Sequence, residues 1–216
     1  MIDPGPGSLV RCAASKPKLD PLTLDAIILT HRHLDHSGDI NVMIEAMTEG
    51  GFKKRGVVFC PGDTVNKDTV ILEYAKKFPQ AIKILKPLTS YRVGNFRFKT
   101  SMRHIHPVET YGFKFNINGV KVSLLTDTKY FKQLQEFYNS DILVLYVVFC
   151  QDRPNIEHLS LIDAEKLIRE IRPKKVILTH FGMSMLRARP NLQAKILSAR
   201  LGIEVSAAYD GMMLKF

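Results

Sequence analysis

The chain of 216 residues contains no tryptophan and only three cysteines, Cys12, Cys60 and Cys150. The cysteines are scattered and form no Cys-x-x-Cys pair, so we expect reduced thiols rather than a disulfide framework. No run of apolar residues approaches the roughly 20 residues of a membrane helix, and the N-terminus does not resemble a signal peptide. These absences favour a cytoplasmic protein without a membrane segment.

Internal repeats, low-complexity tracts and linkers are also absent from the sequence. Its length suits one domain, and we expect residues 1–216 to form a single unit. Apolar residues make up 45% of the chain, which is ordinary for a protein with a packed core. Short apolar runs alternate with helical stretches, so periodicity predicts an α/β or α+β fold.

The expected elements follow from this alternation. Asn118-Gly119 predicts a tight hairpin because both residues tolerate positive φ, and Ser160 with Asp163 resembles a capping box that begins a helix. Strands are predicted at Asp25–Thr30, Gly56–Cys60, Ile82–Leu85, Tyr91–Val93, Phe96–His106, Gly112–Ile117, Val120–Thr126, Ile142–Val148, Val176–Thr179, Glu204–Ala207 and Met212–Phe216. Helices are predicted at Gly38–Thr48, Tyr130–Glu136, Ser160–Ile171 and Asn191–Arg200.

The charge of the chain is strongly basic, with a formal net charge of +10 and a pI near 9.5. Such a balance favours anionic partners such as RNA, DNA or phosphorylated small molecules. The alternative is that these side chains form ordinary solvated faces. No aromatic-rich basic segment resembles a platform for single-stranded nucleic acid. Basic residues recur at Lys53-Lys54-Arg55, at Arg92, Arg97, Lys99 and Arg103, at Arg172, Lys174 and Lys175, and at Arg187 and Arg189.

The segment Thr30-His31-Arg32-His33-Leu34-Asp35-His36 places three imidazoles and one carboxylate in six residues. These are ligand types that bind zinc, manganese or iron. His31 and His33 project together from the end of a strand, whereas Asp35 and His36 follow where the chain turns. One loop could therefore serve two neighbouring ions. The alternative is a polar turn before a helix, but such turns rarely hold this combination, so we favour metal binding.

His-x-His-x-Asp-His after a β-strand resembles the signature of the metallo-β-lactamase superfamily. Its remaining ligands are expected in a fixed order, and His106, Asp127 and His180 each follow an apolar run in that order. The resemblance extends from Ile2 to Met212. It implies an α+β fold of the αββα sandwich type. That fold normally opens with strands before the Ile2-Asp3 turn, so we expect the opening β-hairpin to be missing. Either the sequence is truncated, which we favour, or this fold dispenses with the hairpin.

The resemblance also implies a dinuclear metal centre. Zinc is the favoured metal, with manganese and iron as alternatives. Two divalent cations would lower the pKa of a shared water toward neutrality and clamp the attacked group. Nothing in this scheme needs a Ser or Cys nucleophile, and no Gly-x-Ser-x-Gly is present. The implied ligands are His31, His33 and His106 for the first ion, Asp35, His36 and His180 for the second, and Asp127 as the bridge.

Two polar residues beside these ligands have competing interpretations. His104 and His106 alternate along the predicted strand and would face opposite sides, so we take His104 as an ordinary histidine. Asp3 could orient a histidine of the first loop from behind, or it could be a turn carboxylate before Pro4. The sequence favours neither role for Asp3.

The residues after His106 indicate a branch of the superfamily. His106-Pro107-Val108-Glu109-Thr110-Tyr111-Gly112 is similar to the ribonuclease Z and cyclic-phosphodiesterase branch, as is Asp127-Thr128. In that branch a histidine at the place of His158 can protonate the leaving oxygen; the alternative is an exposed residue before a helix. Two departures separate the chain from ribonuclease Z itself: little more than one hairpin lies between His106 and Asp127, and Leu145–Val148 contains no carboxylate.

These observations favour a dinuclear metal-dependent hydrolase, a phosphodiesterase in which metal-bound hydroxide attacks phosphorus. Asp35 and His158 are the expected catalytic residues. The substrate would be RNA, DNA, or a cyclic or small phosphodiester, and a homodimer is one possible assembly. One alternative is a hydrolase of carboxylic esters, lactones or amides. Another is a non-catalytic metal-bound domain that binds nucleic acid or a protein.

Overall fold

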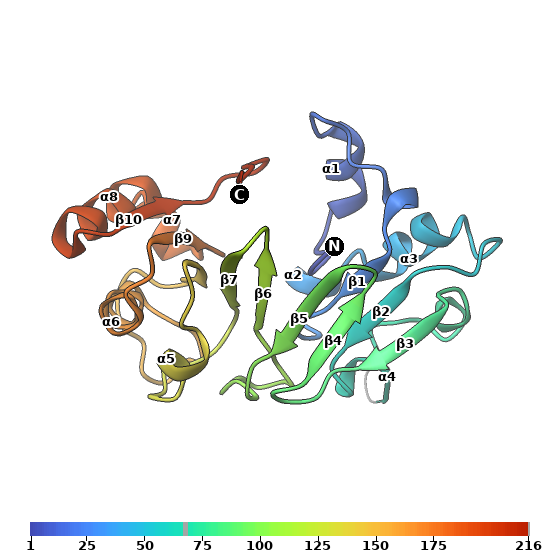
Figure 1. The fold of residues 1–216 in the computed structure, drawn as a ribbon, viewed down its shortest axis with the longest axis horizontal. Helices are drawn as coiled ribbons and strands as arrows, with labels where there is room; N and C mark the ends of the chain where they lie inside the picture. Colours follow the sequence, from blue (N-terminus) through green and yellow to red (C-terminus); the bar gives the residue numbers. More distant parts are fainter. Residues whose placement is uncertain (67–68, 216) are drawn as a thin grey trace. The chain divides into compact units, whose positions relative to one another are not determined.

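A computed structural model of the chain describes residues 1–66 and 69–215 (Figure 1). The chain divides into two compact units, Met1–Phe96 and Arg97–Phe216. The expectation of one hydrolase domain over residues 1–216 stays a prediction. Among the described residues, no helix combines the length and the apolar character needed to cross a membrane.

The first unit is built on a parallel sheet of three strands in the order β1-β2-β3, side by side in Figure 1. These strands are β1 Ala26–Ile28, β2 Val57–Cys60 and β3 Ala81–Ile84. The other elements of this unit are α1 Ser8–Ala14, η1 Pro21–Thr23, α2 Leu34–Ser37, α3 Ile40–Thr48, α4 Asp63–Asn66, η2 Ala75–Lys77 and β4 Ser90–Val93.

Helix α3 shows why this unit packs as it does. Ile40, Met43, Ile44 and Met47 recur at helical spacing and are fully buried. They join a core with apolar residues of β1 and β2. The helix begins two residues later than the predicted Gly38. The three cysteines, all within the described residues, form no disulfide; Cys12 and Cys60 are buried and Cys150 is half-buried.

The second unit holds the strands β5 Phe96–Thr100, β6 Phe113–Ile117, β7 Val120–Leu125, β8 Ile142–Tyr146, β9 Lys175–Thr179 and β10 Glu204–Ala207. They lie side by side in the order β10-β9-β8-β7-β6-β5. The pairs β5–β6 and β6–β7 are antiparallel, whereas β7 to β10 run parallel. The predicted hairpin at Asn118-Gly119 is confirmed, with φ of 51° and 87°.

The parallel part of this sheet needs crossover helices. They are α6 Leu161–Ile171 between β8 and β9, and α7 Met183–Arg187 with α8 Pro190–Leu201 between β9 and β10. The short helix α5 Leu134–Phe137 follows β7. The predicted capping box is confirmed, because the Ser160 hydroxyl accepts from the Asp163 N–H and the Asp163 carboxylate accepts from the Ser160 N–H. Buried Leu and Ile residues of α6 pack with β8 and β9 in one core.

Two predicted strands are wrong. β5 ends at Thr100 instead of His106, because the Ser101 N–H donates to the Gly112 carbonyl and the His104 N–H to the Thr110 carbonyl, which closes a loop. Near the C-terminus, the Met212 N–H donates to the Tyr209 carbonyl and Gly211 has φ of 83°. This turn replaces the strand predicted from Met212, and residues 212–215 are not in a strand. Phe216, the last residue of that prediction, lies outside the described residues.

Candidate metal centre

In the first unit, the candidate ligands lie where β1 leads into α2: His31 and His33 are on the connecting loop, and Asp35 and His36 are in α2 itself. His33 is the N-cap residue of α2, with φ of −59° and ψ of 146°, so the chain turns immediately after it. The turn at residues 3–7 crosses this loop at very close range. A Cβ on Gly5 would lie 2.1 Å from the Asp35 carbonyl oxygen, so only glycine fits there. The turn at residues 3–7 therefore packs tightly against the segment that carries the predicted ligands.

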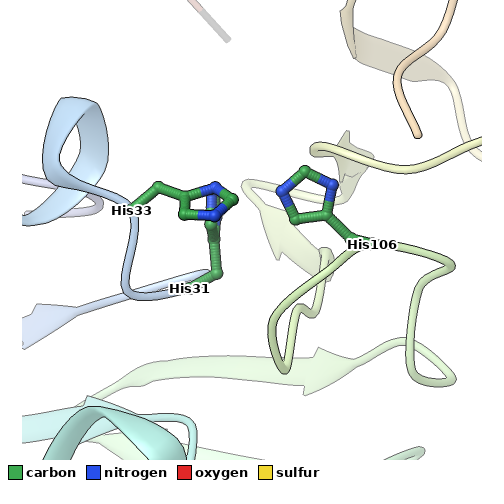
Figure 2. A group of neighbouring side chains, drawn as sticks. All are labelled: His31, His33 and His106. Atoms are coloured by element: carbon green, nitrogen blue, oxygen red, sulfur yellow. The ribbon is translucent and has the colours of Figure 1, made fainter. Parts of the chain in front are cut away.

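His31 and His33 present ring nitrogens to a common point. His31 Nε2 and His33 Nδ1 are 3.1 Å apart, and Figure 2 shows both rings extending from the same loop. Two nitrogens bound to one tetrahedral zinc ion at the usual bond lengths would be about 3.3 Å apart. The two rings could therefore bind one ion with little movement.

Behind these rings, the buried carboxylate of Asp3 holds the loop in place. Its Oδ1 accepts from the Thr30 N–H at 2.7 Å, and its Oδ2 accepts from the Thr30 hydroxyl at 2.7 Å. Oδ2 also lies 2.8 Å from His36 Nδ1. The Thr30 hydroxyl lies 2.9 Å from His31 Nδ1. One carboxylate therefore holds Nδ1 of two histidines, directly or through Thr30, and leaves Nε2 of each for a metal.

Of the two roles considered for Asp3, these contacts favour an orienting carboxylate. Asp3 has a left-handed φ of 47°, a conformation that aspartate tolerates better than most residues. Asp35 lies on the other side of His36, with its Oδ2 3.4 Å from His36 Nε2. The Asp35 side chain is 63% exposed, so it could bind an ion together with His36.

In the second unit, His106 lies on the loop that follows β5 and is labelled in Figure 2. Its Nδ1 lies 3.0 Å from the Glu157 carbonyl oxygen, to which an Nδ1–H can donate. This contact leaves Nε2 as the atom available to a metal. It also ties the loop of His106 to Glu157, which is 51 residues later in the chain and directly precedes His158. The two rings meet edge to face with centroids 5.0 Å apart.

Asp127 lies at the centre of the candidate ligands in this unit. Its side chain is 2% exposed, and it follows β7 by two residues. Oδ1 lies 3.3 Å from His158 Nδ1, and Oδ2 lies 3.6 Å from His180 Nε2. His106, Asp127 and His158 form a group whose ligand atoms all lie within 4.8 Å of one another and could hold a metal ion.

His180 follows β9 in a left-handed conformation, with φ of 60°, which is uncommon for histidine. Its ring stacks on Tyr146 at the end of β8, with centroids 4.7 Å apart and an interplanar angle of 11°. The two strands are paired there, since Tyr146 is the register partner of Thr179. Sequence reasoning missed Tyr146, because no local pattern relates it to a residue 34 positions away.

His104 was predicted to face away from His106 because the two would alternate along a strand. His104 is not on a strand, so that premise is wrong, but His104 is not part of the group formed by His106, Asp127 and His158. Its Nδ1 lies 2.9 Å from the Asp127 carbonyl oxygen and its Nε2 lies 2.6 Å from the Tyr138 hydroxyl. Burial lowers the pKa of His104 to about 4, so the ring is neutral at pH 7. A neutral ring can donate a hydrogen bond from Nδ1–H to the Asp127 carbonyl oxygen and accept one at Nε2 from the Tyr138 hydroxyl. Tyr138 was another residue that the sequence did not indicate.

Each unit by itself offers imidazole and carboxylate ligands of the kind that divalent metals take. In the described residues of the first unit these are His31, His33, Asp35 and His36, and in those of the second unit they are His106, Asp127, His158 and His180. Every residue predicted as a ligand therefore contacts another member of its unit's group. These groups could hold divalent ions, and the ligand types leave the choice of metal open.

Comparison with solved structures shows the fold of the chain. The metallo-β-lactamase fold protein YhfI from Bacillus subtilis has a TM-score of 0.81 and 23% identity, covering 97% of this chain and 84% of that protein. A diphosphatase of the PhnP family has a TM-score of 0.73 and 21% identity, covering 100% and 78%. The short form of human tRNase Z has a TM-score of 0.68 and 18% identity, covering 99% and 86%.

The family model described as the beta-lactamase superfamily domain matches residues 1–181, which contain all the candidate ligands. The predicted fold and the predicted superfamily are thereby confirmed, and the neighbours agree with the predicted ribonuclease Z-like branch. The chain belongs to the metallo-β-lactamase superfamily.

Proposed function

We propose that the ligand groups of the two units combine into one dinuclear metal centre that hydrolyses phosphodiesters. His31, His33 and His106 would hold the first ion. Asp35, His36 and His180 would hold the second, and Asp127 would bridge them. In this proposal residues 1–216 act as one hydrolase domain. The coarser assignment, a metallo-hydrolase of the β-lactamase fold, follows from family membership.

The donor set suits this proposal. Bound divalent cations would supply an activated water at neutral pH and would neutralise the charge on phosphoryl oxygens. The chain's own residues would position these ligands. Asp3 and Thr30 hold Nδ1 of His36 and His31, and the Glu157 carbonyl does so for His106. Zinc is our first choice of metal for these nitrogen-rich groups, with manganese and iron as alternatives.

The contact between His158 and Asp127 is the observation that carries the proposal. The ring of His158 contacts the buried carboxylate of Asp127, and the His158 side chain is 23% exposed, so it is still partly accessible to solvent. An imidazole in this position can deliver a proton to a leaving oxygen, whereas Asp127 holds the ring in place. His158 would therefore act as the general acid, and Asp35 would take part in catalysis as an exposed carboxylate beside His36.

A phosphodiester is favoured over a carboxylic ester by three observations. The residues after His106 and the pair Asp127-Thr128 are similar to the phosphodiesterase branch. The similar solved structures include one named a diphosphatase and one named tRNase Z, and we take these names as support for a substrate that contains phosphate. The net charge of +10 favours an anionic substrate.

The test is steady-state hydrolysis of bis(p-nitrophenyl) phosphate by the metal-stripped chain, reloaded separately with zinc and with manganese. We expect turnover only after reloading, and none for Asp127→Ala. Glu136→Ala removes an exposed carboxylate from α5 and serves as the control, with unchanged turnover expected. Elemental analysis of each sample gives the number of ions bound per chain.

The outcome also separates the alternatives. Two bound ions without turnover of this phosphodiester would contradict the proposal. Turnover of p-nitrophenyl acetate or a lactone in that case would indicate an ester or lactone hydrolase. Inactivity on every ester would indicate a metal-bound domain that binds nucleic acid or a protein without catalysis.

A further inference from the structure

One face of the strands β5, β6 and β7 carries basic side chains in the second unit. Arg97 and Lys99 are two residues apart on β5 and therefore share a face. Lys99 is the register partner of Lys114 on β6, and Lys121 on β7 pairs with Asn116 of β6. We call Arg97, Lys99, Lys114 and Lys121 the basic sheet face.

The opposite face of these strands is apolar and packed. Its members are Phe98, Phe113, Val122 and Leu124, each at most 8% exposed. Because side chains alternate along a strand, the burial of these residues places the basic side chains on the other face of the strands. Arg97, Lys99 and Lys121 are exposed, and Lys114 is half-buried. The sequence alone did not show that these four residues share one surface.

The charges on this face repel one another. Lys99 and Lys114 lie directly opposite, an arrangement that destabilises a sheet when the charges are alike. Burial lowers the pKa of Lys114, and the charges of Lys121 and Lys99 lower it further. Lys114 Nζ lies over the ring of Phe137 at 5.1 Å from its centroid. The acid next to Lys121, Asp141, is paired with Lys174 at 2.9 Å, so its charge is already matched.

We propose that the basic sheet face binds the sugar-phosphate backbone of a nucleic-acid strand. The backbone positions of Arg97 and Lys99 are about 6.8 Å apart along β5, and those of Lys99 and Lys114 are about 4.8 Å apart on neighbouring strands, a close spacing of charge that suits a flexible polyanion. On β7 this face is exposed at Lys121, whereas Ser123 and Leu125, on the same face nearer Asp127, are buried, so the proposed binding surface ends before the ligand group. The proposal concerns binding and does not depend on turnover.

Binding is measured by the fluorescence anisotropy of a labelled single-stranded oligouridylate of 15 nucleotides. EDTA is present throughout, so that no cleavage occurs and failure of the proposed hydrolase activity has no effect on the result. The test variant is Lys99→Gln/Lys121→Gln. The matched control is Arg187→Gln/Lys195→Gln, which removes the same charge from exposed positions of α7 and α8 in the same unit. Thermal unfolding confirms that both variants are folded.

We expect the test variant to bind at least about tenfold more weakly than the wild type, and the control to stay within about twofold. The slope of log affinity against log salt should fall by about 1.4 in the test variant, since each lost phosphate contact on a single strand accounts for about 0.7. Equal affinities for the two variants would overturn the proposal. So would a test variant that loses binding to phosphatidylserine vesicles but keeps its affinity for the oligonucleotide.

Discussion

The two units hold their candidate ligands in different ways. In the first unit, all four candidate ligands come from one segment of six residues at the start of α2, and the carboxylate behind them is Asp3. In the second unit, four ligands come from four separate segments, and the carboxylate among them is Asp127. Both carboxylates are buried, with side chains 7% and 2% exposed.

The surroundings of the two carboxylates suggest different tasks. Asp3 accepts from the backbone and hydroxyl of Thr30 and contacts His36 Nδ1, the atom turned away from Asp35. Asp127 contacts His158 Nδ1 through one oxygen and His180 Nε2 through the other. The contacts fit the proposal that Asp3 positions the ligands and that Asp127 would itself be a ligand. Substitutions of the two carboxylates should therefore have effects on metal binding and activity that differ in size and in kind.

The largest effect is expected from Asp127→Ala. Removing the proposed bridge should lower the metal content below two ions per chain and reduce phosphodiester hydrolysis to the background rate, because both ions lose a ligand. Elemental analysis and the bis(p-nitrophenyl) phosphate assay measure the two quantities on one sample. If Asp127→Ala keeps its full metal content and full activity, Asp127 is not a metal ligand, and the inferred difference between Asp127 and Asp3 is wrong.

His158→Ala tests whether the histidine that contacts Asp127 is a proton donor or a metal ligand. If His158 is a proton donor rather than a ligand, kcat should fall by about 10²- to 10⁴-fold while the metal content is unchanged. A substrate with a better leaving group, such as a diester of 2,4-dinitrophenol, should restore much of the rate, because it needs less protonation. Loss of an ion from this variant would instead make His158 a ligand, in keeping with its place in the group of His106 and Asp127.

Asp3→Asn should have a smaller effect. The amide keeps the shape of the side chain but weakens its contacts with Thr30 and His36, and the loss of such an orienting group typically lowers metal affinity about 10- to 100-fold. Competition with a chromophoric chelator measures this affinity. Asp20→Asn is the control, since Asp20 is exposed and only caps η1. Complete loss of both ions from Asp3→Asn would show that the two carboxylates do not differ as inferred.

The same contrast explains how much of the site could be predicted from the sequence. The ligands of the first unit lie within six residues, so their spacing is visible as a motif. The hairpin at Asn118-Gly119 and the capping box at Ser160 are equally local, and both were predicted correctly. The partners in the second unit are far apart in the sequence. His158 reaches Asp127 across 31 residues and His104 reaches Tyr138 across 34, distances over which no periodicity relates one residue to another.

The strand predicted at Phe96–His106 was too long for a related reason, since β5 ends at Thr100. Residues Phe96–His106 alternate like a strand, but the backbone beyond Thr100 is engaged elsewhere. The Lys129 N–H donates to the Ile105 carbonyl, and His104 Nδ1 lies within hydrogen-bond distance of the Asp127 carbonyl. These tertiary contacts override the local pattern and turn the segment into the loop that carries His106. Sequence periodicity contains no information about them.

The smallest expected effect concerns the support behind Asp127. Tyr138→Phe removes the hydroxyl that lies 2.6 Å from His104 Nε2 in a fully buried pair, which leaves a polar nitrogen without that partner. We expect a loss of about 1–3 kcal/mol in the free energy of unfolding. For a chain of this size the midpoint of thermal unfolding should fall by about 2–4 °C for each kcal/mol.

Tyr209→Phe provides the control for this measurement, since Tyr209 is 70% exposed and its substitution should leave the midpoint unchanged. Calorimetry of both variants gives the midpoints, and metal competition then shows whether the effect reaches Asp127. Because His104 contacts the backbone carbonyl of Asp127 and not its side chain, we expect metal affinity to change much less in Tyr138→Phe than in Asp3→Asn. A larger loss of metal affinity in Tyr138→Phe than in Asp3→Asn would mean that the second unit also relies on a supporting residue behind its ligands. The two units would then hold their ligands in more similar ways than their contacts suggest.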